Sequence, residues 1–107
     1  MSVIFVSVND TYRPGMSYDE AAKVAHAAWP ITLATGRKVD NLVAVYKGVP
    51  IMAWPILGAY KSEETYETNG GPRPRIAFSL GGTIPLRPEW LSVPLNLRRG
   101  VMYALDI

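Results

Sequence analysis

Hydrophobic positions concentrate between Leu42 and Leu57, where two apolar runs rich in β-branched residues flank Lys47-Gly48. Apolar runs on either side of a two-residue turn are typical of a β-hairpin. The second run contains Pro50 and Pro55, and a proline has no N–H to donate to a neighbouring strand. We therefore predict a hairpin whose second arm is an edge strand or carries a bulge.

Polar and small apolar residues alternate with helical spacing from Ser17 to Trp29. Ser17 and Glu20 have the spacing of a capping box, in which each side chain binds the other residue's backbone N–H. Pro30 must end the helix, because proline cannot continue helical hydrogen bonding. One face of this predicted helix carries small residues that would let it approach a sheet closely: Ala21, Val24, Ala25 and Ala28.

Three further apolar segments predict strands, at Val3–Val8, Arg75–Leu80 and Gly100–Ile107. The first alternates only loosely, as expected of a strand that is covered on both faces. The polar, acidic stretch from Tyr60 to Gly71 predicts an exposed loop. Short helical turns are expected within Ile31–Asp40 and at Pro88–Leu91.

These elements predict a single α+β domain spanning residues 1–107. Its core would be a small, strongly curved and mostly antiparallel sheet, or a partly open barrel, of about five strands with one main helix. At this length a chain can bury one hydrophobic core.

Composition excludes some kinds of binding site but does not identify a function. Hydrophobic residues make up 49% of the chain and charged residues 19%, which is typical of a folded protein. The net charge of +2 gives no general affinity for polyanions, so only a local basic patch would bind them. The chain has no cysteine, which excludes disulfides and thiolate metal sites. Without a signal-peptide pattern or a membrane-span-length apolar run, a cytoplasmic location is expected.

Catalytic and metal-binding chemistry finds little support. His26 is the only histidine, and spacing places no nucleophile or carboxylate beside it, so a structural or surface role is favoured. Glu63, Glu64 and Glu67 are expected to be solvated in the polar loop. We predict no catalytic residues, no metal site and no cofactor.

Aromatic and arginine side chains are interleaved along the chain. Aromatic rings stack on nucleobases and arginine forks bind phosphate, so this combination suits a nucleic-acid or nucleotide pocket. Trp29 and Trp54 could equally be core residues, and that alternative stays open. The candidate ligand-binding residues are Tyr12, Arg13, Trp29, Arg75, Arg98 and Arg99.

Four stretches are spread over nearly the whole length of the chain: VNDTYRPGMSYDEAAKVAHAAW, VDNLVAVYKGVPIMAW, RIAFSLGG and LRRGVMYALDI. They resemble a poorly characterised bacterial domain family, similar in architecture to the small PUA and ASCH β-barrels that bind RNA or modified bases. Similar segments occur beside GIY-YIG-type nuclease domains. The matching positions are Tyr12, Arg13, Gly15, Met16, Ser17, Trp29, Ala44, Val45, Tyr46, Gly48, Arg75, Phe78, Arg99, Gly100 and Tyr103.

The resemblance implies nucleic-acid binding by analogy, since a fold does not determine a function. This chain departs from the family pattern around Trp29, where similar sequences carry arginines. Here the neighbours are Ala27, Ala28 and Pro30. The residues available to replace those arginines are Arg37 and Lys38.

The leading hypothesis is a non-catalytic module of the PUA-like kind that binds RNA, DNA or a nucleotide. The alternative is an interaction subunit that forms a homodimer through the strand from Val49 to Leu57. An enzyme is the third choice. Salt-sensitive binding of nucleic acid would favour the first hypothesis, and concentration-dependent dimerisation would favour the second.

Overall fold

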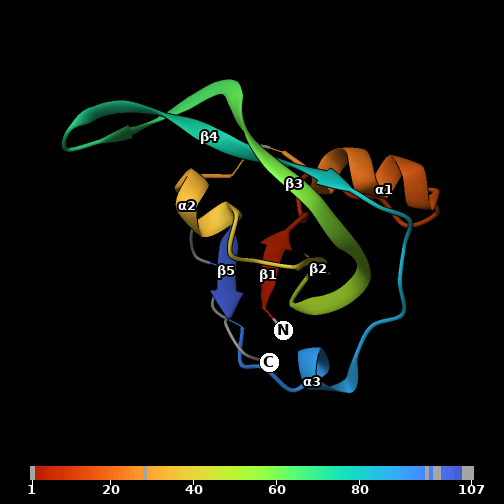
Figure 1. Ribbon diagram of the computed structural model, residues 1–107. Helices are drawn as coiled ribbons and strands as arrows, with labels where there is room; N and C mark the ends of the chain where they lie inside the picture. Colours follow the sequence, from red (N-terminus) through yellow and green to blue (C-terminus); the bar gives the residue numbers. More distant parts are fainter. Residues whose placement is uncertain (1, 28, 96, 98–99, 105–107) are drawn as a thin grey trace.

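The computed structural model describes residues 2–27, 29–95, 97 and 100–104. Figure 1 shows the arrangement of strands and helices. The strands are β1 (Val3–Ser7), β2 (Asn41–Tyr46), β3 (Val49–Thr68), β4 (Gly71–Leu80) and β5 (Val101–Ala104). The helices are α1 (Tyr18–Ala25), α2 (Leu33–Gly36) and α3 (Pro88–Leu91), so both predicted short turns are present.

The strands form one curled sheet, a half-barrel, in the order β4-β3-β2-β1-β5. β1 and β2 run parallel, because the connection between them crosses over through α1 and α2. The other described pairings, β1 with β5, β2 with β3 and β3 with β4, are antiparallel. The predicted α+β fold with a small, strongly curved sheet is therefore confirmed, and the sheet is mixed because β1 and β2 are parallel.

Helix α1 begins at the predicted position. Ser17 is its N-cap, with the Ser17 hydroxyl 3.2 Å from the Glu20 N–H that it accepts from. The Glu20 carboxylate accepts in turn from the Ser17 backbone N–H, which completes the capping box. Ala21 and Ala25 are buried against the sheet, so the small residues of this helix provide the close approach that the sequence predicts.

Helix α1 ends at Ala25 rather than reaching Trp29 as predicted. The chain instead pairs with the edge of β4. Trp29 and Ile76 exchange two backbone hydrogen bonds of 2.9 Å, and the His26 carbonyl accepts from Phe78 N–H at 2.8 Å. Strand-like pairing thus replaces the last predicted turn of helix.

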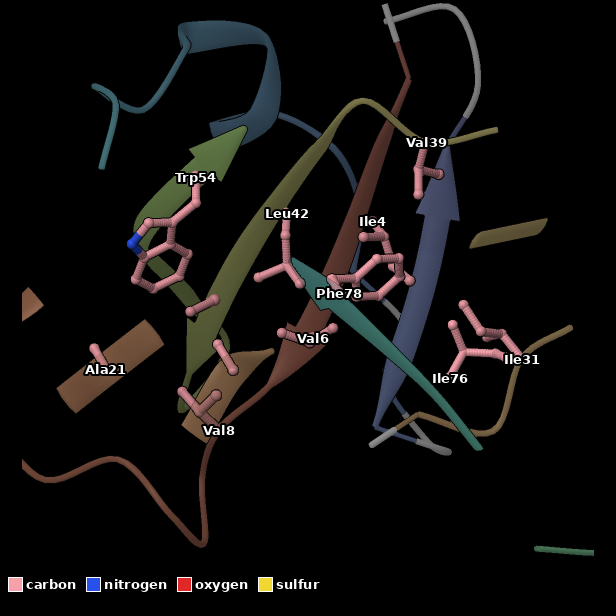
Figure 2. Packing of buried hydrophobic residues seen from close by; sticks show 12 residues of the cluster. Ile4, Val6, Val8, Ala21, Ile31, Val39, Leu42, Trp54, Ile76 and Phe78 are labelled. Atoms are coloured by element: carbon pink, nitrogen blue, oxygen red, sulfur yellow. The ribbon is translucent and has the colours of Figure 1, made fainter. Parts of the chain in front are cut away.

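The inner strands are buried on both faces, as the loose alternation of the first strand predicted. One face packs against α1, the segment after it and the base of the β3/β4 hairpin, as Figure 2 shows. The other face is covered by the segment after β4 that contains α3, with Trp90 fully buried. The first cluster is Ile4, Val6, Val8, Ala21, Ala25, Ile31, Val39, Leu42, Ala44, Trp54, Ile76 and Phe78. The second is Val3, Phe5, Val43, Val45, Ala53 and Trp90.

The predicted hairpin is present, and its turn explains the Lys47-Gly48 pair. Both residues have positive φ, 51° and 81°, which is the backbone of the tight hairpin turn that matches strand twist. The Lys47 N–H donates to the Asn9 side-chain oxygen at 2.7 Å, which stabilises the only non-glycine positive φ among the described residues.

The second hairpin arm is bulged, as predicted, but β3 as a whole is not an edge strand. Ala44 pairs with Met52 and Val45 with Pro50, so Ile51 is an inserted residue. From Ile56 onward β3 pairs with β4 instead of β2, which places β3 inside the sheet.

Proline is tolerated at position 55 because its backbone faces away from β2. The Pro55 carbonyl accepts from the Gly81 N–H at 2.9 Å on the other side of the strand. In an antiparallel pair, the backbone groups of one residue all point the same way. The N–H that Pro55 lacks would therefore not have bonded to its β2 partner, Asn41.

The prediction of an exposed loop from Tyr60 to Gly71 is wrong. β3 continues to Thr68, turns at Asn69-Gly70 and returns as β4, so the two strands form an arm beyond the core (Figure 1). The Thr68 hydroxyl stabilises the turn by donating to the Gly71 carbonyl at 2.7 Å and accepting from the Gly70 N–H at 3.2 Å. A ribbon exposed on both faces needs no apolar alternation, which is why the polar sequence read as a loop.

None of the helices in the described part of the chain is long and apolar enough to cross a membrane.

Candidate binding groove

A groove of about 710 Å³ lies beside Trp29, and we call it the Trp29 groove. It forms where the end of β1, the loop after it, the end of α1 and the β3/β4 arm meet. Two of the predicted ligand-binding residues, Trp29 and Arg75, line it together although they are far apart in sequence. Its lining residues are Ser7, Asp10, Thr11, Val24, Ala27, Trp29, Glu63, Glu64, Thr65 and Arg75.

Trp29 is fixed on three sides. Its backbone pairs with Ile76 of β4, and its indole N–H donates to the Ala25 carbonyl at the end of α1 at 2.9 Å. A Cβ placed on Gly100 would lie 3.6 Å from Trp29 Cζ3, so the backbone just before β5 passes close to the ring. Half-buried and held this way, the indole has a defined orientation beside the groove.

A bulge in β3 sets the wall opposite Trp29. Lys61 pairs with Ile76 and Thr65 with Pro74, so three β3 residues, at positions 62–64, face the single β4 residue Arg75. The Arg75 Nε–H donates to the Thr65 carbonyl at 3.4 Å across this bulge. Bulges re-aim side chains at the edges of sheets, and here the bulge brings Glu63 and Glu64 to the groove.

The charge of the Trp29 groove differs from the positive charge expected of a phosphate-binding site. Its described lining includes three carboxylates, from Asp10, Glu63 and Glu64, against the single guanidinium of Arg75. A phosphate placed there would face more negative than positive charge, which is unfavourable in any dielectric. The combination instead suits an uncharged planar group that donates hydrogen bonds.

Tyr12 and Arg13 are near the Trp29 groove in sequence but are absent from its lining, whereas Thr11 and Asp10 are part of it. Tyr12 is half-buried and packs edge-on against Tyr46, with ring centroids 5.1 Å apart and an angle of 63°. Edge-to-face aromatic pairs of this kind stabilise packing. Arg13 is exposed in the same loop. Their predicted roles in binding stay predictions.

Arg98 and Arg99 lie outside the described residues, so their predicted role also stays a prediction. The same holds for Ala28, one of the positions at which the chain departs from the family pattern. The described residue that follows Arg99, Gly100, lies close to the Trp29 ring, and its carbonyl accepts a hydrogen bond from the Ser7 N–H at 2.7 Å.

The remaining candidates are structural. Trp54 is 1% exposed and belongs to the core, so of the two roles left open by the sequence, core or ligand contact, the core role applies to this residue. His26 Nδ1 lies 2.6 Å from the Lys23 carbonyl, and its own carbonyl accepts from β4, as expected of a residue that ends a helix. Among the described residues, no group of three or more His, Cys, Asp or Glu side chains could hold a metal ion.

Sequence reasoning missed the acidic wall of the Trp29 groove. Glu63 and Glu64 were assigned to a solvated loop, and they are indeed exposed, but they belong to a strand that faces Trp29. The signal that could have found them is the Asn69-Gly70 pair, which is a strong hairpin indicator. The β-forming residues on both sides of that pair, such as Tyr66 and Thr68, support the same assignment.

No protein-family model, curated protein or solved structure matches this chain.

Proposed function

We propose that this chain is a non-catalytic module of the PUA-like type that binds nucleic acid or a nucleotide, with a base taken into the Trp29 groove. The observation that carries the proposal is the convergence of Trp29 and Arg75 in one groove. The bacterial domain family that the sequence resembles supports the same function by analogy.

The chemistry of the groove favours a base over the sugar-phosphate backbone. An indole offers an apolar π-surface on which any base can stack, worth about 1–3 kcal/mol per base. Carboxylates accept hydrogen bonds only, so Glu63, Glu64 and Asp10 fit the amino and imino N–H groups of a base edge. The guanidinium of Arg75, held at its Nε–H by the Thr65 carbonyl, adds a positive charge that favours a base carbonyl. A base must leave its helix to enter such a groove, so single strands are the expected ligands.

The first experiment is fluorescence anisotropy with labelled single-stranded RNA, single-stranded DNA and duplex DNA at low and moderate salt. Tryptophan emission is followed in the same titrations. Trp54 and Trp90 are 1% and 0% exposed, so a ligand-induced change in emission reports mainly on Trp29. Saturable binding to a single strand, together with quenching, supports the proposal. Absence of binding to all three nucleic acids at low salt overturns it.

A second candidate function is homodimerisation through the strand from Val49 to Leu57. One observation favours it: within the described residues, β3 from Val49 to Met52 pairs only with β2, which leaves its other edge without a strand. Val49 and Leu57 are 58% and 72% exposed, and a groove of about 380 Å³ next to Met52 is partly apolar. An open edge can pair with its own copy about a two-fold axis.

Size-exclusion chromatography with light scattering tests this second candidate. Val49→Lys would add a charge to the open edge and is expected to abolish a dimer if that edge forms it. Lys23→Glu, which changes the charge of an exposed α1 residue, is the control. A monomer at all micromolar concentrations overturns this candidate and leaves the first one intact.

A further inference from the structure

A second groove, of about 130 Å³, lies between α2 and the β3/β4 arm, and we call it the arm groove. Among the described residues that line it there are two cations, Lys61 and Arg73, and no carboxylate. Its charge is therefore opposite to that of the Trp29 groove. The lining residues are Ile31, Thr32, Leu33, Lys61, Tyr66, Arg73, Pro74 and Ile76.

The fold holds the walls of the arm groove at fixed positions. Tyr66 and Arg73 are directly paired in the β3/β4 register, so their side chains share one face of the arm. The opposite wall is α2, which packs closely on the base of the hairpin. A Cβ on Gly36 would lie 3.1 Å from Ile76 Cγ2 and 3.3 Å from Ala59 Cβ, so only glycine permits this approach without a shift. Figure 1 shows α2 beside the base of the arm.

Both cations of the arm groove are available to a ligand. Lys61 and Arg73 are exposed, and neither forms an ion pair within the part of the chain that the structure describes. Tyr66 is half-buried beside them and carries a phenol hydroxyl, whereas the Thr32 hydroxyl caps α2 by donating to Thr35 Oγ1 at 3.0 Å and accepting from the Thr35 N–H at 3.2 Å. An ammonium, a guanidinium fork and hydroxyl donors are the groups that recognise a phosphate.

The two grooves are neighbours. Thr65 lines the Trp29 groove and the next residue, Tyr66, lines the arm groove. On β4, Arg75 lines the first and Pro74 the second. Successive residues of a strand point to opposite faces, so the two grooves lie on opposite sides of the arm, and a single strand with a base beside Trp29 would pass around the edge of the arm to bring a phosphate to Lys61 and Arg73.

We propose that the arm groove binds a backbone phosphate of a single-stranded nucleic acid, next to the base held in the Trp29 groove. This inference rests on the proposed function and adds a second contact of opposite chemistry. Phosphate contacts set position and affinity without distinguishing nucleotide sequences, whereas contacts with the base distinguish one base from another. The two contacts thus have separable effects.

The test combines ¹H–¹⁵N NMR titration with anisotropy, using a six-nucleotide single-stranded RNA on the full chain. The variants are Lys61→Gln and Arg73→Gln, which remove charge at exposed positions and leave the core intact. Lys23→Gln, at an exposed α1 position that lines neither groove, is the matched control. Each groove variant is expected to weaken binding about three- to fivefold for every base composition, as loss of one exposed charge contact does.

Three outcomes are distinguishable. Saturable amide shifts at Lys61, Tyr66 and Arg73, together with weaker binding by both groove variants and unchanged binding by the control, support the inference. Binding with shifts confined to the Trp29 groove and unaffected by the groove variants overturns the inference while the proposed function stands. No binding by the wild-type chain overturns both.

Discussion

At the scale of single residues, Trp29 and Trp54 show how environment separates two side chains of one type. Trp54 is 1% exposed inside the core cluster, so its whole surface is packed. Trp29 is half-buried, with its indole N–H bonded to the Ala25 carbonyl and its ring beside a groove. Trp54 therefore serves stability, whereas Trp29 lines the groove in which the proposed ligand would stack.

Replacing each tryptophan by phenylalanine should separate these roles. Trp54→Phe leaves a cavity in a packed core and is expected to cost about 1–3 kcal/mol in free energy of unfolding, with unchanged nucleic-acid affinity. Trp29→Phe is expected to cost less stability but to weaken binding, because the stacking surface shrinks and the bond to Ala25 is lost. Urea unfolding and anisotropy measure the two quantities. Equal affinity of Trp29→Phe and the wild-type chain would contradict the binding role of Trp29.

Gly36 offers a second residue-scale test, because an added methyl group there meets buried neighbours. Its Cβ would lie 3.1 Å from Ile76 Cγ2, and Ile76 is 1% exposed and stiff. Gly36→Ala is expected to lower the free energy of unfolding by about 1 kcal/mol, the overpacking penalty less the gain in helix propensity. Gly58→Ala, where nothing lies within 4 Å of the added Cβ, is the control and should not lower the free energy of unfolding.

At the scale of elements, a carboxylate links the start of β1 to the start of β2. Asp40 Oδ2 accepts from both the backbone N–H and the hydroxyl of Ser2, each at 3.1 Å. The Ser2 carbonyl accepts from the Asp40 N–H at 3.0 Å, and the Asp40 carbonyl accepts from Ile56 on β3. The contact thus helps to set the register of the parallel pair and extends to the next strand.

This contact predicts a pH dependence of stability. The hydrogen bonds from the Ser2 backbone and side chain lower the pKa of Asp40 below its ordinary value. A lowered pKa in the folded state means that stabilisation is complete above the unfolded value near 3.8 and is lost as pH falls through the folded pKa. Asp40→Asn should cost up to about 1 kcal/mol at pH 7, since solvent screens this exposed group, and the cost should shrink as pH falls through the folded pKa.

The measurement is urea unfolding of wild type and Asp40→Asn at several pH values, with Asp10→Asn as the control at an exposed carboxylate outside this contact. A constant difference between wild type and Asp40→Asn from neutral to acidic pH would contradict the assignment. The Ser2 hydroxyl would then hold the strands without help from the charge.

Local chemistry made some elements predictable and left others out of reach. The Ser17 capping box, the Lys47-Gly48 turn and the bulge next to Pro50 are each encoded within a few residues. The end of α1 was not predictable, because distant β4 residues compete for its last backbone groups. The arm was missed because an exposed ribbon carries no apolar pattern. Because the arm was not predicted, the positions of Glu63 and Glu64 and the charge of the Trp29 groove could not be predicted either.

At the scale of the whole molecule, the sheet is covered on both faces, so a ligand has access mainly at its margins. One margin carries the arm, which separates an acidic groove with a tryptophan from a cationic groove with a tyrosine. The net charge of the chain is only +2, so these local differences, and not a general field, must direct a charged ligand.

This distribution of charge predicts a shallow salt dependence of nucleic-acid binding. The described cations that line the two grooves are Lys61, Arg73 and Arg75. Each cation that neutralises a phosphate of a single strand contributes about −0.7 to the slope of log K against log salt concentration. Because Arg75 faces three carboxylates, we expect a slope of about −1.5, set mainly by Lys61 and Arg73.

Anisotropy titrations between ~50 and ~200 mM salt measure this slope. Lys61→Gln should reduce its magnitude by about 0.7, whereas Trp29→Phe should lower affinity at every salt concentration and leave the slope unchanged. A wild-type slope steeper than about −4 would mean that many more phosphates are neutralised than these cations can reach. Binding would then be a general polyanion interaction, and the division between a base groove and a phosphate groove would be wrong.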